Sequence, residues 1–273
     1  MSHLVTIGIP MFDNQSTVSQ TISSLREQSF EDWTCVICDD SENSATITAA
    51  RIAIGDDTRF QIFDNDERLG AAANWNKTLN QATSKYFKLL CADDVLESEA
   101  LATEVAGLES DDSVVMTCGR RNIIDSRGKT IIKDRGLSGK MRKISGQRAT
   151  NKFVTTGTNF FGEPSFVLFR TDALISAGGF NSEWSYLIDV ISYLDVLQIG
   201  DLQFLDRNLG SFRISQTSWS ANLSNQQKSE TFRAIDYGSN LDKGSIDLFG
   251  RYRGKIRAFS NSQARRLVFK YLA

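Results

Sequence analysis

The sequence has one histidine, almost no net charge and no long apolar run, and each shortage excludes a class of protein. The only histidine is His3, so counting alone argues against a histidine-based triad or a multi-histidine metal site. A formal net charge of −2 over 273 residues argues against a nucleic-acid partner. No apolar run approaches the length of a membrane span.

The four cysteines and the N-terminus point to a reducing compartment. Cys35 and Cys38 have the spacing of a redox pair, but they lie in the strand-like run 33–38. Residues three apart on a strand face opposite sides, so these thiols are predicted to be buried small hydrophobes. Residues 1–7 start a strand at once and lack the basic and apolar regions of a signal peptide. We therefore expect a cytoplasmic protein.

Strand and helix patterns alternate through the first third of the chain. Short β-prone apolar runs predict strands at 4–10, 33–38, 59–63 and 86–91. Helical spacing predicts a first helix through Val18, Ile22 and Leu25, capped by Ser16, and further helices at 44–54 and 70–79. This alternation is typical of a mostly parallel sheet covered by helices.

After residue 96 the pattern changes. Helices are predicted at 101–108, 171–177 and 187–197, and strands at 114–118, 166–169, 202–205 and 209–212. Residues 125–128 read as a hairpin turn, and the polar segment 133–148 is predicted to be a mobile loop. We therefore divide the chain into residues 1–96, residues 97–220 of the same domain, and a basic helical extension (221–273).

Two of the predicted strands end in paired acids, Asp39-Asp40 and Asp93-Asp94. In an open α/β sheet, ligands bind at the carboxyl ends of the strands. Adjacent carboxylates repel and stay ionised cheaply only near a cation or open water, and Mg²⁺ or Mn²⁺ favours such oxygen ligands. The alternative is a solvated turn in which Asp94 caps the next helix.

The turn after the first strand, Pro10-Met-Phe-Asp13, has no Gly-x-Gly fingerprint, and the chain has no P-loop. A dinucleotide cradle built from glycine backbone is therefore not expected. If this edge of the sheet binds phosphates, a metal bridging a pyrophosphate fits the sequence better.

Taken together, six segments resemble the family 2 glycosyltransferases of the GT-A fold, from about residue 4 to residue 220. They are Ile9-Pro10-Met11-Phe12-Asp13-Asn14, Ile37-Cys38-Asp39-Asp40-Ser41, Arg68-Leu69-Gly70 with Asn74, Ala92-Asp93-Asp94, Gly178-Gly179-Phe180, and Phe212-Arg213. The resemblance implies an α/β protein with a mostly parallel central sheet flanked by helices. It also implies a Mn²⁺- or Mg²⁺-dependent inverting enzyme of cell-surface polysaccharide or glycolipid synthesis. Such an enzyme moves one sugar from a nucleotide-diphosphate donor to a hydroxyl of a glycan or lipid-linked acceptor.

The resemblance implies that residues 1–96 form the nucleotide-sugar-binding half and residues 97–220 the acceptor-binding half. It also implies a role for each matching residue. Pro10, Phe12, Asp39 and Arg68 would bind the base and diphosphate of the donor. Asp93 would face the ribose and the metal, and Asp94 would bind the metal. Asp189 would activate the acceptor, and Glu163 and Trp184 are candidate acceptor contacts.

Chemistry supports Asp189 independently, because the attacking hydroxyl must lose its proton to a base and no suitable histidine exists. Simpler roles stay open at this point: a helix cap for Asp189, a turn for Asp39, core packing for Phe12 and Trp184, and a solvated loop for Glu163. A nucleotidyltransferase and a non-catalytic nucleotide-sugar-binding protein are the alternative functions on a similar fold.

The chain also departs from its relatives. Cys91 stands where many of them carry the first acid of Asp-x-Asp-Asp, and Ile188 rather than Glu precedes Asp189. The chain continues Ile214-Ser215 after Arg213, where relatives often have His. The Gln-x-x-Arg-Trp motif of processive relatives is absent, which indicates one sugar per encounter.

The end of the chain is basic. Residues 251–270 carry seven Arg or Lys residues and no acid, interleaved with aromatic and aliphatic residues. A helix of this composition is predicted to dock peripherally on an anionic membrane surface, at the inner membrane face. The alternative is a helix packed on the catalytic domain with a solvated basic face.

Overall fold

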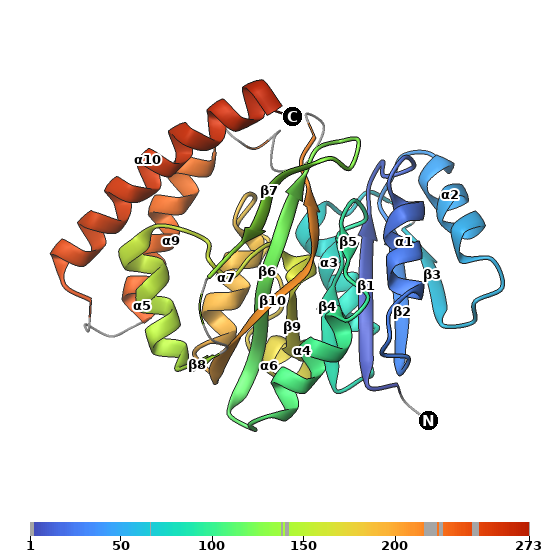
Figure 1. Cartoon of the computed structure of the whole chain (residues 1–273), viewed down its shortest axis with the longest axis horizontal. Helices are drawn as coiled ribbons and strands as arrows, with labels where there is room; N and C mark the ends of the chain where they lie inside the picture. The colour runs from blue at the N-terminus through green and yellow to red at the C-terminus, as the bar shows by residue number, and fades with distance from the viewer. Residues whose placement is uncertain are drawn as a thin grey trace.

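The computed structural model describes residues 3–65, 67–137, 139, 142–215, 223, 226–241 and 246–272, with side chains up to 263. A twisted sheet runs through the molecule, with helices on both faces (Figure 1). Its strands are β1 (Val5–Met11), β2 (Trp33–Asp39), β3 (Phe60–Asp64), β4 (Tyr86–Leu89), β5 (Val95–Leu96), β6 (Val114–Ile124), β7 (Thr130–Arg135), β8 (Arg142–Ile144), β9 (Val167–Arg170) and β10 (Asp201–Arg213). The helices are α1 (Val18–Arg26), α2 (Ala45–Ile54), α3 (Ala71–Asn80), α4 (Ala100–Glu109), α5 (Gly146–Thr156), α6 (Thr171–Ser176), α7 (Ile188–Val196), α9 (Gln227–Leu241) and α10 (Leu248–Leu272), with a 3₁₀ turn, η1, at Pro164–Phe166.

The strand order brings most carboxyl ends to one edge of the sheet. The main path is β3-β2-β1-β4-β9-β6-β10-β5, with β7 paired to β6 and β8 to β10. β1 to β4 are mutually parallel, β9 is antiparallel to both β4 and β6, and β10 is parallel to β6. The two reversals at β9 cancel. The carboxyl ends of β1, β2, β3, β4, β6 and β10 therefore share one edge with the amino end of β9.

Each face of the sheet has its own apolar core. Helices α1, α2 and α4 pack on one face, and Val18, Ile22 and Leu25 of α1 are fully buried there, as their spacing predicts. Helices α3, α6 and α7 cover the other face, with α5, α9 and α10 behind them (Figure 1). The predicted fold class, a mostly parallel sheet flanked by helices with a helical C-terminal extension, is confirmed.

Three local predictions were wrong. The N-cap of α1 is Thr17, and Ser16 does not cap it. The segment 133–148 is not a simple loop, because it contains β8 and the start of α5, where the side chain of Ser145 accepts a hydrogen bond from the backbone N–H of Arg148 (3.3 Å). Residues 202–205 and 209–212 belong to one strand, β10, because bulges against β6 absorb the polar residues between them.

The last two helices belong to the packed domain. A Cβ on Gly254 of α10 would lie 1.8 Å from the carbonyl oxygen of Val154, so α10 and α5 touch through their backbones. Asp236 of α9 pairs with both Arg251 and Lys255 of α10 at 2.7 Å. One face of α10 is thus held on the domain. Within the ranges described above, no helix is both long and apolar enough to cross a bilayer.

Candidate active site

The shared edge of the sheet gathers the candidate residues from distant parts of the sequence. Phe12 follows β1, Asp39 ends β2, Asp93 follows β4 and Arg213 ends β10, while Glu163 directly precedes the turn that leads into β9. Because these strand ends are neighbours in the sheet order, the topology alone assembles one site.

On the donor side, Phe12 and Arg68 lie side by side at the surface. Phe12 is 37% exposed, and the guanidinium carbon of Arg68 lies 4.5 Å from the centre of its ring. Arg68 also lies 3.6 Å from Glu42. Phe12 is therefore not a core residue, and the pair offers an aromatic face beside a cation. Pro10, one residue before the end of β1, is half-buried beneath them.

Asp39 is a nearly buried carboxylate at the end of β2. It accepts hydrogen bonds from the backbone N–H (3.2 Å) and the hydroxyl (2.6 Å) of Ser41. Burial raises the pKa of Asp39, and the charges of Asp64 and Asp13 raise it further against the hydrogen bonds from Ser41. A ligand that donated a hydrogen bond to Asp39 would offset the cost of burying its charge, and the N–H of a nucleobase could be such a donor.

Two residues without a predicted role fix the backbone around Asp39 and Arg68 by hydrogen bonds. The carboxylate of Asp40 accepts hydrogen bonds from the backbone N–H groups of Leu69 (2.7 Å) and Gly70 (2.9 Å) and so fixes the turn before α3. The buried amide of Asn74 donates to the carbonyl oxygen of Cys38 (3.1 Å) and ties α3 to the end of β2. The signal was present, since both residues lie in the motifs that carry the family resemblance.

The adjacent acids after β4 have different environments. Asp94 is 0% exposed, and its two oxygens accept hydrogen bonds from the Ser165 hydroxyl (2.6 Å) and the Arg213 backbone N–H (3.0 Å). Asp93 is half-buried, and no side chain in the described ranges donates a hydrogen bond to its carboxylate. Burial raises the pKa of Asp93 to about 6. Burial and the charge of Asp93 raise the pKa of Asp94 well above its usual range.

The two acids therefore take different parts. Asp94 is neither a solvated turn residue nor a helix cap, because its side chain is buried. Its hydrogen bonds with Ser165 and Arg213 join the segment after β4 to η1 and to the end of β10. Asp93 is the more exposed of the two, and within the described ranges its carboxylate accepts no side-chain hydrogen bond.

Arg213 joins the opposite sides of the site. It is nearly buried, and its Nε donates to the backbone carbonyl of Asp93 (2.9 Å). Its Nη1 donates to the carbonyl of Asp125 in the β6–β7 turn (3.2 Å), and its Nη2 donates to the Gln20 side chain of α1 (2.5 Å). Its charge opposes the rise in the pKa of Asp93. Sequence reasoning noticed Phe212-Arg213 but gave it no role.

Asp189 lies in the first turn of α7 and does not cap it, because the N-cap is Leu187. The side-chain amide nitrogen of Asn159 lies 3.5 Å from a carboxylate oxygen of Asp189. Asn159 also donates to the carbonyl and accepts from the N–H of Gly162, each at 3.1 Å, which fixes the turn on which it sits.

Asp189 is connected to the paired acids through the segment 159–165. Asn159 of this segment lies 3.5 Å from Asp189, and the hydroxyl of Ser165 in the same segment donates to Asp94. The pKa of Cys91, between β4 and the paired acids, is raised first by burial and then by the charges of Asp94, Asp93 and Asp189. The residues expected for metal binding and for acceptor activation therefore contact the same short segment.

The two candidate acceptor contacts have other partners. Glu163 forms a two-pronged ion pair with the guanidinium of Arg121 (2.5 and 3.0 Å), and Arg121 is 1% exposed. Burial raises the pKa of Glu163, but the charge of Arg121 and its hydrogen bonds outweigh this effect and lower it. Glu163 is thus not a solvated loop acid but part of a structural pair beside the site.

Trp184 is not available to stack on a sugar, which corrects its assignment as an acceptor contact. It is 3% exposed, the guanidinium carbon of Arg233 lies 4.1 Å from its ring centre, and Tyr237 packs edge-on at 6.0 Å. Trp219, a second tryptophan considered from the sequence for stacking on an acceptor sugar, lies outside the described residues.

The residues at this edge fit a divalent cation as an incomplete ligand set. Asp93 supplies one carboxylate that accepts no side-chain hydrogen bond among the described residues. The pKa values of Asp93 and of its neighbour Asp94 are both raised, so a nearby cation would favour their charged forms. No three His, Cys, Asp or Glu side chains among the described residues form a ready metal cage. A Mg²⁺ or Mn²⁺ ion would therefore take most of its ligands from donor phosphates and water, as Mg²⁺ sites commonly do.

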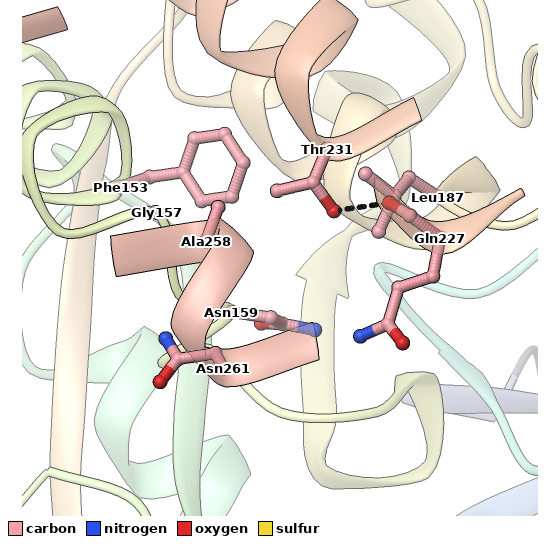
Figure 2. A pocket seen from close by; sticks show the side chains of 8 residues that line it. All are labelled: Phe153, Gly157, Asn159, Leu187, Gln227, Thr231, Ala258 and Asn261. Carbon is pink, nitrogen blue, oxygen red and sulfur yellow. Dashed lines mark hydrogen bonds between the residues drawn. The ribbon is translucent and has the colours of Figure 1, made fainter. Parts of the chain in front are cut away.

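A small cavity is lined by Asn159, which contacts Asp189, and by Leu187, two residues before Asp189 (Figure 2). Leu187 and Asn159 come from the Asp189 side, and Gln227 and Asn261 from α9 and α10, with the remaining wall formed by Phe153, Gly157, Thr231 and Ala258. Figure 2 shows the amides of Asn159, Gln227 and Asn261 around one gap. The helical extension thus forms part of the surroundings of Asp189.

The sequence of the chain matches a family model and several curated relatives. A family model described as glycosyl transferase family 2 matches residues 6–177. An uncharacterised protein of Mycobacterium tuberculosis is 29% identical over 76% of this chain and 66% of its own length. The Escherichia coli glucosyltransferase WfgD, which acts on α-D-GlcNAc-diphosphoundecaprenol, is 28% identical over 38% of this chain and 40% of its own length. The matches thus span about two thirds of the length of the first of these relatives and less than half of the second.

Solved structures share the fold. Residues 1–349 of Staphylococcus aureus TarS, bound to UDP-GlcNAc, superpose with a TM-score of 0.70 at 14% identity over 96% of this chain and 72% of that chain. A mannosyltransferase of Pyrobaculum calidifontis, bound to GDP-Man and Mn²⁺, gives a TM-score of 0.63 at 15% identity over 97% and 76%. These likenesses confirm the GT-A fold. With the family model covering more than half of the sequence, the chain belongs to glycosyl transferase family 2.

Proposed function

We propose that this chain is an inverting glycosyltransferase that moves one sugar from a nucleotide-diphosphate donor to a hydroxyl of a glycan or lipid-linked acceptor. Cell-surface polysaccharide or glycolipid synthesis is the proposed setting. The observation that carries the proposal is that one short segment, 159–165, contacts both groups of acids: Asn159 lies 3.5 Å from Asp189, and Ser165 donates to Asp94, the neighbour of Asp93. Inverting transfer needs these two groups: one near the leaving diphosphate and one near the attacking hydroxyl.

The donor half binds and orients the nucleotide. Phe12 offers its ring face to the base, Asp39 accepts a hydrogen bond from the base, and Arg68 supplies positive charge toward the diphosphate. Asp93 would hold a Mn²⁺ or Mg²⁺ ion, which supplies positive charge to the leaving diphosphate. Asp94, buried behind it, keeps the strand end in place.

The acceptor half moves the proton. Asp189 takes the proton from the acceptor hydroxyl as its oxygen bonds to the anomeric carbon. The bond from that carbon to the diphosphate oxygen breaks, and the nucleoside diphosphate leaves with the electron pair. Attack from the side opposite the leaving group inverts the anomeric configuration.

A screen of nucleotide sugars, with and without Mn²⁺, tests this proposal. The expected result is release of nucleoside diphosphate from one donor, dependent on metal and stimulated by an acceptor, with an inverted product anomer by NMR. Release of pyrophosphate from a nucleoside triphosphate and a sugar 1-phosphate, with no sugar transfer from any nucleotide sugar, would instead identify a nucleotidyltransferase. Tight donor binding with no turnover on any acceptor would identify a binding protein.

We also propose that the acceptor side faces an anionic membrane. WfgD and a Campylobacter jejuni glucosyltransferase that is 30% identical over 36% of this chain are both named for undecaprenol-linked acceptors. The face of α10 that is turned away from the domain carries exposed apolar side chains at helical spacing: Leu248, Phe249, Tyr252, Ile256 and Phe259. Arg253 and Arg257 are exposed beside them. An apolar stripe with a basic flank is the pattern of a helix that lies in a membrane interface.

Vesicle co-sedimentation tests the docking without removing a packed helix. We expect binding to vesicles that contain phosphatidylglycerol to weaken roughly tenfold when three stripe residues become serine, since each loses buried apolar area. The variant is Leu248→Ser, Phe249→Ser and Tyr252→Ser. Its matched control changes exposed isoleucines elsewhere: Ile52→Ser, Ile175→Ser and Ile199→Ser.

Charge is tested separately with Arg253→Gln and Arg257→Gln. This pair is expected to weaken binding to phosphatidylglycerol vesicles about tenfold at low salt and to leave binding to phosphatidylcholine unchanged. Equal pelleting of all variants, or none of the unmodified chain, contradicts docking. A stripe-dependent change in mass by light scattering without vesicle binding would show that the stripe joins two copies instead.

A further inference from the structure

A carboxylate from the helical extension holds the backbone that leads to Asp189. Glu230 lies in the first turn of α9. Its Oε1 accepts a hydrogen bond from the backbone N–H of Ser185 (3.1 Å), and its Oε2 accepts from the N–H groups of Tyr186 (2.8 Å) and Leu187 (3.1 Å). Three consecutive N–H groups thus converge on one side chain, immediately before α7.

These contacts lie just before α7, and one of them binds the N–H of its N-cap residue. The N-cap of α7 is Leu187, which has no side chain able to accept a hydrogen bond from the first turn. The amino end of a helix leaves N–H groups without partners inside the helix, and a negative charge near it is stabilising. Glu230 supplies both an acceptor and a charge from another element, so the start of α7 depends on α9.

A second set of contacts fixes α7 against α9. Trp184, just before the N–H groups bound by Glu230, packs between Arg233 and Tyr237 of α9. The hydroxyl of Tyr237 donates to a carboxylate oxygen of Asp195 in the last turn of α7 (2.6 Å). Both ends of α7 are thus attached to α9, and Asp189 lies between them.

We propose that Glu230 is a positioning residue that sets the place of Asp189 through the backbone at 185–187. The inference rests on the proposed function, in which Asp189 accepts the acceptor proton. Glu230 is separate from the donor residues described above, which lie on β1, β2, β4 and the turn before α3. It therefore affects the proton-transfer step and not donor binding.

Steady-state kinetics of the full chain tests this separation. Glu230→Ala is expected to lower kcat by about tenfold to a hundredfold, because a catalytic group displaced by about 1 Å loses that much. The Kd for the nucleoside diphosphate with Mn²⁺ is expected to stay within about twofold, since an interaction made only in the transition state leaves ground-state binding unchanged. Glu230→Gln can keep two of the three hydrogen bonds through one oxygen, so its loss of kcat should be smaller than that of Glu230→Ala.

The matched control is Glu183→Ala. The carboxylate of Glu183 is exposed, lies 3.7 Å from the guanidinium of Arg233, and binds none of the three N–H groups. This variant should leave kcat unchanged. The second readout is a double-mutant cycle: adding Glu230→Ala to Asp189→Asn should cost almost nothing more if Glu230 acts through Asp189.

The outcomes separate the two proposals. A large effect of Asp189→Asn with wild-type kcat in Glu230→Ala would overturn the positioning role and leave the proposed function intact. Wild-type kcat in Asp189→Asn would overturn the base itself. Equal losses of kcat and donor affinity in Glu230→Ala would make Glu230 a general structural residue and refute the inference. If Glu230→Ala does not fold, the same criteria apply to Glu230→Gln.

Discussion

Replacing Asp94 by asparagine distinguishes a structural carboxylate from a metal ligand. Asp94 is fully buried, and both of its oxygens accept hydrogen bonds, from the Ser165 hydroxyl and the Arg213 backbone N–H. The oxygen of Ser165 also accepts from the N–H of Cys91 (3.0 Å), and among the described residues Asp94 is the acceptor of its hydroxyl proton. Both neighbours are therefore donors toward position 94.

The magnitude follows from this arrangement. An asparagine presents one oxygen and one NH₂ group, so one of the two donors would face another donor. A buried donor without an acceptor, together with the lost charged hydrogen bond, costs about 3 kcal/mol. Removing the charge relieves its burial and its repulsion with Asp93, the two effects that raise the pKa of Asp94, which returns about 1 kcal/mol. The net expectation is a loss of about 2 kcal/mol in the free energy of unfolding.

Urea unfolding of the wild-type chain and two variants measures this difference. Asp93→Asn is the matched control, because it makes the same chemical change at a half-buried neighbour whose carboxylate has no side-chain donor. Its free energy of unfolding should be equal to or higher than that of wild type near neutral pH, because the change removes the buried charge whose cost raises the pKa of Asp93. If Asp94→Asn is as stable as wild type but loses Mn²⁺-dependent donor binding, Asp94 is a metal ligand and the structural assignment fails.

Three further outcomes are expected. Asp93→Asn should remove the Mn²⁺-dependent part of donor affinity in calorimetric titrations with and without chelator, and an unchanged metal dependence would place the ion elsewhere. Asp189→Asn should cut turnover by roughly 10²–10⁴-fold while nucleoside diphosphate still binds, the usual worth of a general base; a parallel loss of donor affinity would make it a donor ligand. Glu163→Gln should destabilise the fold by about 2 kcal/mol near neutral pH, because it leaves the buried guanidinium of Arg121 unpaired. Since the pKa of Glu163 is lowered in the fold, its contribution is present above its unfolded pKa of about 4.3 and is lost as pH falls through the lower folded value. Urea midpoints across acidic pH should therefore converge for wild type and variant, and a difference independent of pH would contradict the ion pair.

Local sequence patterns were sufficient wherever one face of an element is apolar. The runs at 33–38 and 86–91 and the spacing of Val18, Ile22 and Leu25 describe β2, β4 and α1 closely. Patterns failed where the signal was short or polar. Helix α5 follows a polar stretch, although Ser145 as its cap and Gly157 as its end were readable from the sequence.

The candidate site divides in the same way. The sequence identified Asp93, Asp94 and Asp189 through residue type and position near strand and helix ends. It could not rank Asp93 against Asp94, because adjacent residues have similar local signals. Ser165 and the end of β10, distant in sequence, decide which carboxylate is buried.

The sequence by itself determined the alternating fold, the carboxylate chemistry and the family, because these depend on local periodicity and on motif order. Only the tertiary structure decided which partner each polar group finds. Trp184 was a candidate acceptor contact by sequence, but Arg233 of α9 packs on its ring. No sequence pattern around Glu230 indicated that its carboxylate would bind the backbone before α7. Hydrogen bonds and burial between distant segments depend on how the chain closes in space, and neighbouring residues in the sequence do not carry that information.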